Sequence, residues 1–327
     1  MKPLDYIGNE FQLYGKEEYV LTSGRASGVK IWHVKNGKGL EMCINLDRGF
    51  DIVSLTHHSV NVSYLTPNGY VSSKYYDDKG LGFLKSFSAG FLTTCGLTQA
   101  GSPNNDLGEE LPLHGTYSHI PVSNAQYIDE ENELVLKGEI LDETIFSHKL
   151  KLVRTIRISK EKNSFSIEDE IINRGDQVTP LEVLYHMNMG YPYLDEDAIL
   201  KINSTQVEGR NEHASQDIEN WMHMHEPQAG FIEKCYYHHF ANRAEVRLFQ
   251  PKLNKGIEIT FDSHSLPFLT EWKMLGVRDY VLGLEPGNCT PDGRNVGREK
   301  GWLKFIKPQE KITYHIDVRM LEDQKDM

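Results

Sequence analysis

The stretch HKLKLVRTIRIS at residues 148–159 and the segment SFSIEDEII at residues 164–172 decide the fold class. Both alternate apolar with polar side chains, which is the pattern of a strand that buries one face. Arg154 and Arg157 flank the isoleucines of the first stretch, and this arrangement indicates one slip in register. A short polar turn at residues 160–163 separates the two segments. We therefore predict one long antiparallel hairpin.

Similar alternating runs recur along the chain and predict an all-β protein. They lie at residues 28–34, 39–46, 133–140, 244–250, 255–261, 279–285 and 311–318. Asn36-Gly37 predicts a tight hairpin turn between the first two of these runs. Only residues 217–225 suggest a helix. We predict a large antiparallel β-sandwich that forms a single domain over residues 1–327.

Two segments lack the strand pattern. Residues 92–101 and 283–301 are rich in Gly, Thr, Pro and Asn, which is typical of loops. Binding and catalytic residues are often carried by long loops on a rigid sheet. We therefore expect the functional site near these two segments.

The composition is that of an ordinary globular protein with an acidic surface. Of the 327 residues, 47 are acidic and 35 are basic, which gives a formal net charge of −12. Such a surface repels nucleic acid and anionic lipid, because their binding depends on clustered Lys and Arg. The four cysteines lie far apart, and no apolar stretch precedes the first residues. We expect a cytoplasmic protein with reduced thiols that binds neither nucleic acid nor a membrane, and a homodimer is left open.

Three short segments place ionisable residues at the ends of strands or turns. They surround His114 in LPLHGTYSH, His186 in LEVLYHMNMGYP and Glu285 in LGLEPGNCTPDGR. Glu285 follows an apolar run, and a carboxylate carried into the interior needs a partner or a chemical role. His186 ends another apolar strand, and imidazole exchanges protons near neutral pH. Glu285 and His186 are therefore candidates for a base and an acid.

The order of these segments resembles the aldose 1-epimerase superfamily, the galactose mutarotase-like proteins. The resemblance is carried by Arg48 in NLDRGFDI, His114 in LHG, His186 in H-x-N-x-G-Y-P, FLTEWK at residues 268–273 and LEPGNCTPDGR. It spans most of the chain and points to a poorly characterised branch of that superfamily. It implies the β-supersandwich fold of the family. It also implies an isomerase that interconverts the anomers of a free or modified sugar by acid–base ring opening.

The resemblance further implies roles for individual residues. Glu285 matches the general base that takes the proton from the anomeric hydroxyl. His186 matches the general acid that protonates the ring oxygen. His114 matches a histidine that hydrogen-bonds the sugar, and Arg48 matches a substrate-binding arginine.

Three more residues are candidates for contacts with the substrate. Asn188 belongs to the same strand motif as His186. Trp272 offers an aromatic ring that can stack on a sugar face. Arg294 lies in the polar stretch after Glu285, which is typical of a site for a modified or acidic sugar.

Two alternatives stay open. The first is a metal-dependent sugar isomerase or epimerase, with ligands drawn from His114, His119, His186 and Glu285. None of the histidine pairs has a characteristic metal-ligand spacing, so we expect neither a metal nor a cofactor. The second alternative is a non-catalytic carbohydrate-binding protein whose aromatic side chains stack on the sugar.

Overall fold

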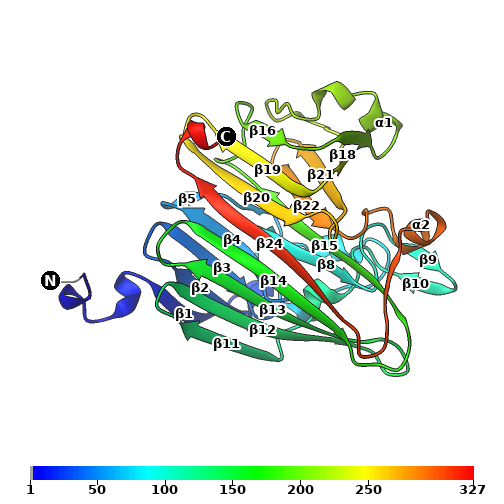
Figure 1. The fold of residues 1–327 in the computed structure, drawn as a ribbon, viewed down its shortest axis with the longest axis horizontal. Coiled ribbons are helices and arrows are strands. Elements are labelled where there is room, and N and C mark those ends of the chain that lie inside the picture. Colours follow the sequence, from blue (N-terminus) through cyan, green and yellow to red (C-terminus); the bar gives the residue numbers. More distant parts are fainter. Residues whose placement is uncertain (1–2) are drawn as a thin grey trace.

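The computed structural model describes residues 3–327, and most of its regular structure is antiparallel sheet (Figure 1). Three large sheets make up the molecule, and their inner faces share one apolar core. The prediction of an all-β antiparallel sandwich is confirmed. In the described part of the chain, no helix has the length and apolar character needed to cross a membrane.

The first large sheet comes from the N-terminal part of the chain, and the second combines strands from residues 124–173 with strands from residues 199–321. The five-stranded sheet has the order β1 (Gly15–Val20), β2 (Lys30–Lys35), β3 (Leu40–Asn45), β4 (Asp51–His57), β5 (Val60–Asn61). The eight-stranded sheet has the order β11 (Asn124–Asp129), β12 (Glu133–Glu143), β13 (Lys149–Ser159), β14 (Ser164–Asn173), β24 (Lys311–Leu321), β20 (Lys255–Asp262), β19 (Arg243–Gln250), β16 (Ile199–Ile202).

The third large sheet has seven strands. Its order is β17 (Gln206–Gly209), β18 (Lys234–His239), β21 (Phe268–Leu275), β22 (Tyr280–Gly287), β15 (Thr179–Met189), β23 (Lys304–Ile306), and β8 (Leu92–Leu97) also pairs with β15. Two short ribbons pair β6 (Tyr64–Leu65) with β7 (Ala89–Gly90) and β9 (Asn104–Asp106) with β10 (Glu109–Leu111).

Helices are short in the described residues. The two α-helices are α1 (Glu212–Ser215) and α2 (Arg294–Glu299). The 3-10 helices are η1 (Pro3–Tyr6), η2 (Glu10–Gln12), η3 (Gly24–Ala26), η4 (Ser73–Tyr75), η5 (Gly82–Lys85), η6 (Tyr117–His119), η7 (Ile218–Asn220) and η8 (Gln324–Asp326). The helix suggested at residues 217–225 is therefore only the single turn η7, and α2 lies in a segment that was predicted to be a loop.

The predicted hairpin is β13 and β14, near the middle of the eight-stranded sheet. The two strands pair without interruption from Leu150 opposite Asn173 to Ile158 opposite Phe165. The predicted slip in register is wrong. Arg154 takes a regular inward position between Leu152 and Ile156, where an apolar residue would be expected. Its charge interrupts the apolar alternation in the sequence, although the backbone continues unchanged.

The two other local predictions need correction. β2 and β3 form the expected hairpin, but its connection spans residues 36–39, and positive φ angles fall on Gly37 and Gly39. The side-chain oxygen of Asn36 accepts the backbone N–H groups of Lys38 and Leu40, so Asn36 organises the turn through its side chain. Residues 92–97, predicted as a loop, form the buried strand β8, because this strand is covered on both faces and needs no polar alternation.

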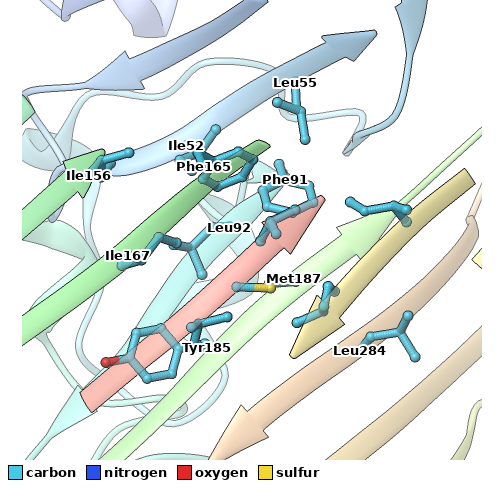
Figure 2. Close-up of a cluster of buried hydrophobic side chains, with 14 of the residues drawn as sticks. Ile52, Leu55, Phe91, Leu92, Ile156, Phe165, Ile167, Tyr185, Met187 and Leu284 are labelled. Atoms are coloured by element: carbon cyan, nitrogen blue, oxygen red, sulfur yellow. The ribbon is translucent and has the colours of Figure 1, made fainter. Parts of the chain in front are cut away.

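The core lies between the inner faces of the three large sheets. Figure 2 shows side chains from β4, β13, β14, β15 and β22 meeting in one apolar layer. Phe91, next to β8, packs edge-on against Phe165 of β14, with 5.9 Å between the ring centroids. Burying one such aliphatic or aromatic side chain contributes roughly 1.5–3 kcal/mol. This apolar layer therefore holds the sheets together.

A buried charge network crosses the same interior. The Arg154 guanidinium donates to both carboxylate oxygens of Asp169 at 2.8 and 2.6 Å and to Asp51 at 2.6 Å. Thr94 donates its backbone N–H and its hydroxyl to Asp51, and the Tyr185 hydroxyl donates to Asp169. Each buried charge is thus paired and hydrogen-bonded, as burial of charge requires. The network joins β4, β8, β13, β14 and β15 across all three sheets.

We predict that Arg154→Met strongly destabilises the protein, because it leaves the buried carboxylates of Asp51 and Asp169 without their cation. The expected loss is about 3–5 kcal/mol in the free energy of unfolding, measured by urea denaturation. Arg157→Met is the matched control on the same strand, since Arg157 is 46% exposed in its side chain and pairs only with surface carboxylates. Equal losses in the two variants would contradict the role of the network.

Candidate functional site

A cavity of about 670 Å³ opens on one face of the seven-stranded sheet. Residues from four neighbouring strands of this sheet line its floor: Cys235 on β18, Thr270, Trp272 and Met274 on β21, Val281 and Glu285 on β22, and His186 on β15. Alternate residues of a strand share a face, so the sheet register brings these side chains to one side. The volume is within the range of small-molecule sites.

His186 and Glu285 meet on this floor. β15 and β22 are antiparallel with Met187 opposite Leu284. This register places His186 opposite Glu285. His186 Nδ1 lies 3.3 Å from Glu285 Oε1, and both side chains are almost completely buried. This distance is short enough for an ion pair, but the His186 ring and the Glu285 carboxyl group are not oriented for a hydrogen bond between them. The two predicted catalytic residues are therefore adjacent and face the same cavity.

Burial shifts both groups toward their uncharged forms. It raises the pKa of Glu285 well above its usual 4.5; Arg210 opposes this shift and Glu233 adds to it. Burial lowers the pKa of His186 to about 4. Both shifts disfavour charge, as expected for a low-dielectric site. Titratable pairs with opposed shifts in a cleft are typical of acid–base centres.

Three polar atoms on the cavity floor lack a hydrogen-bond partner among residues 3–327. They are His186 Nδ1, Glu285 Oε1 and Thr270 Oγ1, on the adjacent strands β15, β22 and β21. Buried polar atoms are nearly always hydrogen-bonded, and each exception needs an explanation. A hydroxyl-rich ligand in this cavity would provide donors and acceptors at all three positions.

His114 reaches the cavity from the loop after β10. Its backbone has a positive φ of 59° and is held by two hydrogen bonds, one to Gly101 O and one from Gly96 N. The Gly101 N–H donates to His114 Nδ1 at 3.3 Å, which assigns the remaining hydrogen of the neutral ring to Nε2. Burial lowers the pKa of His114 well below 6.5, so the ring is neutral. His114 is thus an oriented hydrogen-bond donor beside His186, with 5.5 Å between the ring centroids.

The lining of the cavity combines aromatic rings with charged groups. Phe83, Phe87, Tyr64 and Trp272 supply rings, and the Trp272 indole donates to Glu233 at 2.7 Å. Arg210 also lines the cavity and donates to Asp292 at 3.0 Å and to the Ser102 hydroxyl at 2.8 Å. A ligand in this cavity therefore meets flat apolar surfaces and fixed polar groups together.

A family model described as a domain of unknown function, DUF4432, matches residues 26–320. The chain belongs to the DUF4432 family. No curated protein matches it in sequence.

Solved structures show the fold of this DUF4432 chain. A proposed aldose 1-epimerase from Klebsiella pneumoniae superimposes with a TM-score of 0.90 at 24% identity, covering 97% of this chain and 87% of that one. A galactose mutarotase-like protein from Clostridium acetobutylicum gives 0.66 at 14% identity, covering 94% and 99%. Galactose 1-epimerase from Lactobacillus acidophilus gives 0.63 at 12% identity, covering 95% and 100%. The fold is galactose mutarotase-like, as the sequence resemblance implied.

The structure brings four of the seven predicted site residues to the cavity and leaves three outside its lining. Glu285, His186, His114 and Trp272 line it. Asn188 is buried beside it and donates its side-chain amide to the backbone carbonyl of His186 at 2.8 Å. It therefore supports the strand that carries His186.

The two predicted arginines lie elsewhere. Arg48 donates to the carbonyls of Ser118 and Ser86 and lies 2.5 Å from His119 Nε2, in a separate buried cluster. Arg294 pairs with Asp106 at 2.7 Å and with Glu109, at the start of α2. Both guanidinium groups are occupied by protein partners, so the geometry does not bring them to a ligand in this cavity.

Sequence reasoning did not select Arg210, Glu233 or Thr270. Arg210 and Glu233 lie outside any motif, and Thr270 is one of many threonines in strands. Their place depends on the pairing of β17, β18, β21 and β22, which no local pattern encodes. Two signals were available for Thr270: it lies within the FLTEWK segment, and it precedes Trp272 by two residues, on the same face of one strand.

The groups suited to metal binding lie away from this cavity. In the described part of the chain, three metal-ligating side chains come together at His57, His58 and Glu322 and at Asp195, Glu196 and Asp197. His119, one of the ligands considered for a metal-dependent isomerase, stacks on Tyr76 with 3.8 Å between the ring centroids. It does not line the cavity with His114 and His186.

We predict a pH-dependent gain in stability for Glu285→Gln. The folded chain retains a proton on Glu285 that the unfolded chain releases above about pH 4.5, so the wild type loses stability as the pH rises from 4.5 toward the raised pKa. The glutamine of the variant does not titrate, so the variant does not lose stability in this way as the pH rises. Urea denaturation should show that its advantage over the wild type grows with pH. Glu168→Gln, at an exposed position of β14, should show a constant difference, and a constant difference for Glu285→Gln would contradict the buried pKa.

Proposed function

We propose that the protein interconverts the anomers of a sugar by acid–base ring opening. The observation that carries the proposal is the adjacent, buried pair of His186 and Glu285 on the floor of the cavity. Glu285 takes the proton of the anomeric hydroxyl, and His186 gives a proton to the ring oxygen. The bond between the anomeric carbon and the ring oxygen breaks as the carbonyl forms. Rotation about the next carbon–carbon bond and reversal of the steps complete the reaction.

The pair can supply both proton transfers of the reaction. The reaction removes one proton and adds one proton, so a pair that holds a single proton is sufficient and no other reactant is consumed. Burial keeps the proton of the pair on Glu285 while the cavity is empty, so the reactive form arises when that proton passes to His186, 3.3 Å away. Ionised Glu285 is then a stronger base, and protonated His186 a stronger acid, than the same groups in water. General acid–base catalysis of this kind contributes about 10²- to 10⁴-fold in rate.

The cavity wall also suits a sugar. A sugar ring has apolar C–H faces and a rim of hydroxyl groups, so it needs aromatic surfaces and hydrogen-bonding groups together. Trp272 and Phe87 flank His186, with ring centroids 5.2 and 5.4 Å from its own. His114 Nε2–H and Arg210 add donors around the rim. In this arrangement His114 binds a hydroxyl and Trp272 stacks on a ring face.

We predict that the protein accelerates anomer exchange and that Glu285→Gln slows it by about 10²- to 10⁴-fold, because the variant cannot accept a proton. Exchange NMR on a panel of aldoses, ketoses and acidic sugars measures the rate. His186→Asn should show a similar loss, and Glu168→Gln, at an exposed position of β14, should behave as the wild type. Binding of a sugar without acceleration would support a carbohydrate-binding protein instead.

A second prediction concerns Gly283, which makes room for the base. A Cβ atom at this position would lie 2.5 Å from Glu285 Oε1 and 3.0 Å from Trp272 Cβ. Gly283→Ala should therefore displace the carboxylate and lower the exchange rate by about 10-fold or more. Gly8→Ala is the control, since nothing lies within 4 Å of its Cβ position. Wild-type rates in Gly283→Ala would show that the position of Glu285 does not limit the reaction.

A further inference from the structure

A second cluster of ligating side chains, formed by His57, His58 and Glu322, lies outside the lining of the cavity. His57 ends β4, His58 begins the turn to β5, and Glu322 directly follows β24. His57 Nε2 lies 3.2 Å and His58 Nε2 lies 3.5 Å from the same oxygen, Glu322 Oε1. The three donor atoms all lie within 4.8 Å of one another. None of these residues lines the cavity with Glu285.

The tight turn after β4 brings the two histidine rings together. Successive side chains of a strand point to opposite faces, so two adjacent histidines would normally diverge. His58 has a positive φ of 50°, which takes it out of the strand and turns its ring toward His57, with ring centroids 4.5 Å apart. Ser59 has a positive φ of 64° as well, so His58 and Ser59 are the two central residues of the tight turn that joins β4 to β5, where positive φ is normal.

Neighbouring groups hold each ligand in place. A Cβ atom at Gly39 would lie 2.5 Å from His58 Nδ1, so only glycine leaves room for this ring. His57 is completely buried, and its Nδ1 lies 2.8 Å from the Tyr193 hydroxyl. That hydroxyl can accept Nδ1–H, which leaves the Nε2 lone pair directed at the cluster.

Two asparagines that directly precede other strands hold Glu322 in place. Asn163, before β14, donates to Glu322 Oε1 at 2.7 Å, and Asn254, before β20, donates to its backbone carbonyl at 3.1 Å. A carboxylate oxygen has a second lone pair, so the contact with Asn163 leaves Oε1 able to bind a cation. The half-exposed side chains of His58 and Glu322 keep the cluster open to solvent.

We propose that His57, His58 and Glu322 form a binding site for one divalent transition-metal ion of the Zn²⁺ class. Ligands at about 2.0–2.1 Å from a tetrahedral ion lie about 3.3 Å apart, and the two measured nitrogen–oxygen distances of 3.2 and 3.5 Å bracket this separation. Two imidazoles and one carboxylate suit Zn²⁺, Co²⁺ or Ni²⁺ better than Ca²⁺ or Mg²⁺, which prefer oxygen ligands. The fourth position faces solvent.

A bound ion would connect parts of the chain that are far apart in sequence. It would link the turn after β4 in the five-stranded sheet to the end of β24 in the eight-stranded sheet (Figure 1). An ion that binds the folded chain and not the unfolded chain raises the stability of the folded state. The site would therefore act as a clamp between two sheets, independent of the chemistry at Glu285.

The test is a titration of the full-length, chelator-treated protein with Co²⁺, followed by its d–d absorption, and with Zn²⁺ in competition with a chromophoric chelator. We expect one equivalent of each metal in the wild type. We expect affinity at least 100-fold weaker in His58→Ala and in Glu322→Gln. These two residues are half-exposed, so both variants should fold, and thermal unfolding in EDTA checks this directly.

The controls separate this site from other metal-binding surfaces. Glu196→Ala removes a member of the acidic group at Asp195–Asp197 and should bind as the wild type, as should Glu285→Gln. Zn²⁺ should raise the melting temperature of the wild type and leave that of His58→Ala unchanged. Failure of the wild type to bind one equivalent, or wild-type affinity in folded His58→Ala, would overturn the proposal.

Discussion

The buried ion network around Arg154 is the interaction on which the arrangement of the three sheets depends. An arginine inside an apolar layer is tolerated only when carboxylates and hydroxyls satisfy it, and here those groups come from each of the large sheets. Apolar packing is tolerant of small rotations and shifts, whereas guanidinium–carboxylate geometry is directional. The network therefore specifies how the sheets meet, while the apolar side chains around it supply most of the stabilisation.

This network also positions the candidate site. Tyr185 donates to Asp169 on one face of β15, and the next residue, His186, points from the other face into the cavity. Thr94 binds Asp51 from β8, which pairs with the same part of β15. The strand that carries His186 is thus held from the core side by charge-assisted hydrogen bonds. A site that needs accurate placement of two groups benefits from such support behind it.

The two sets of buried polar groups differ in one respect. Every charge in the Arg154 network has partners within the chain, whereas His186, Glu285 and Thr270 have polar atoms without them. Satisfied groups favour the folded state, and unsatisfied groups cost stability unless a ligand provides the missing bonds. That difference separates the Arg154 network from the floor of the cavity, although both contain residues of similar type. Arg48 and Arg294 belong to the first kind by the same criterion.

The sequence by itself determined the antiparallel all-β architecture and the pairing of β13 with β14, because alternation and turn chemistry involve residues close together in the chain. Through the segments around His114, His186 and Glu285, it also indicated the fold family and the acid–base pair of the candidate site. It misread Arg154 as a register slip and β8 as a loop, because burial by distant strands reverses what local polarity indicates. Only the tertiary structure decided that Arg210, and not Arg48 or Arg294, reaches the cavity. That choice depends on the register of strands separated by up to a hundred residues, and side chains there meet through long-range pairing that no local pattern records.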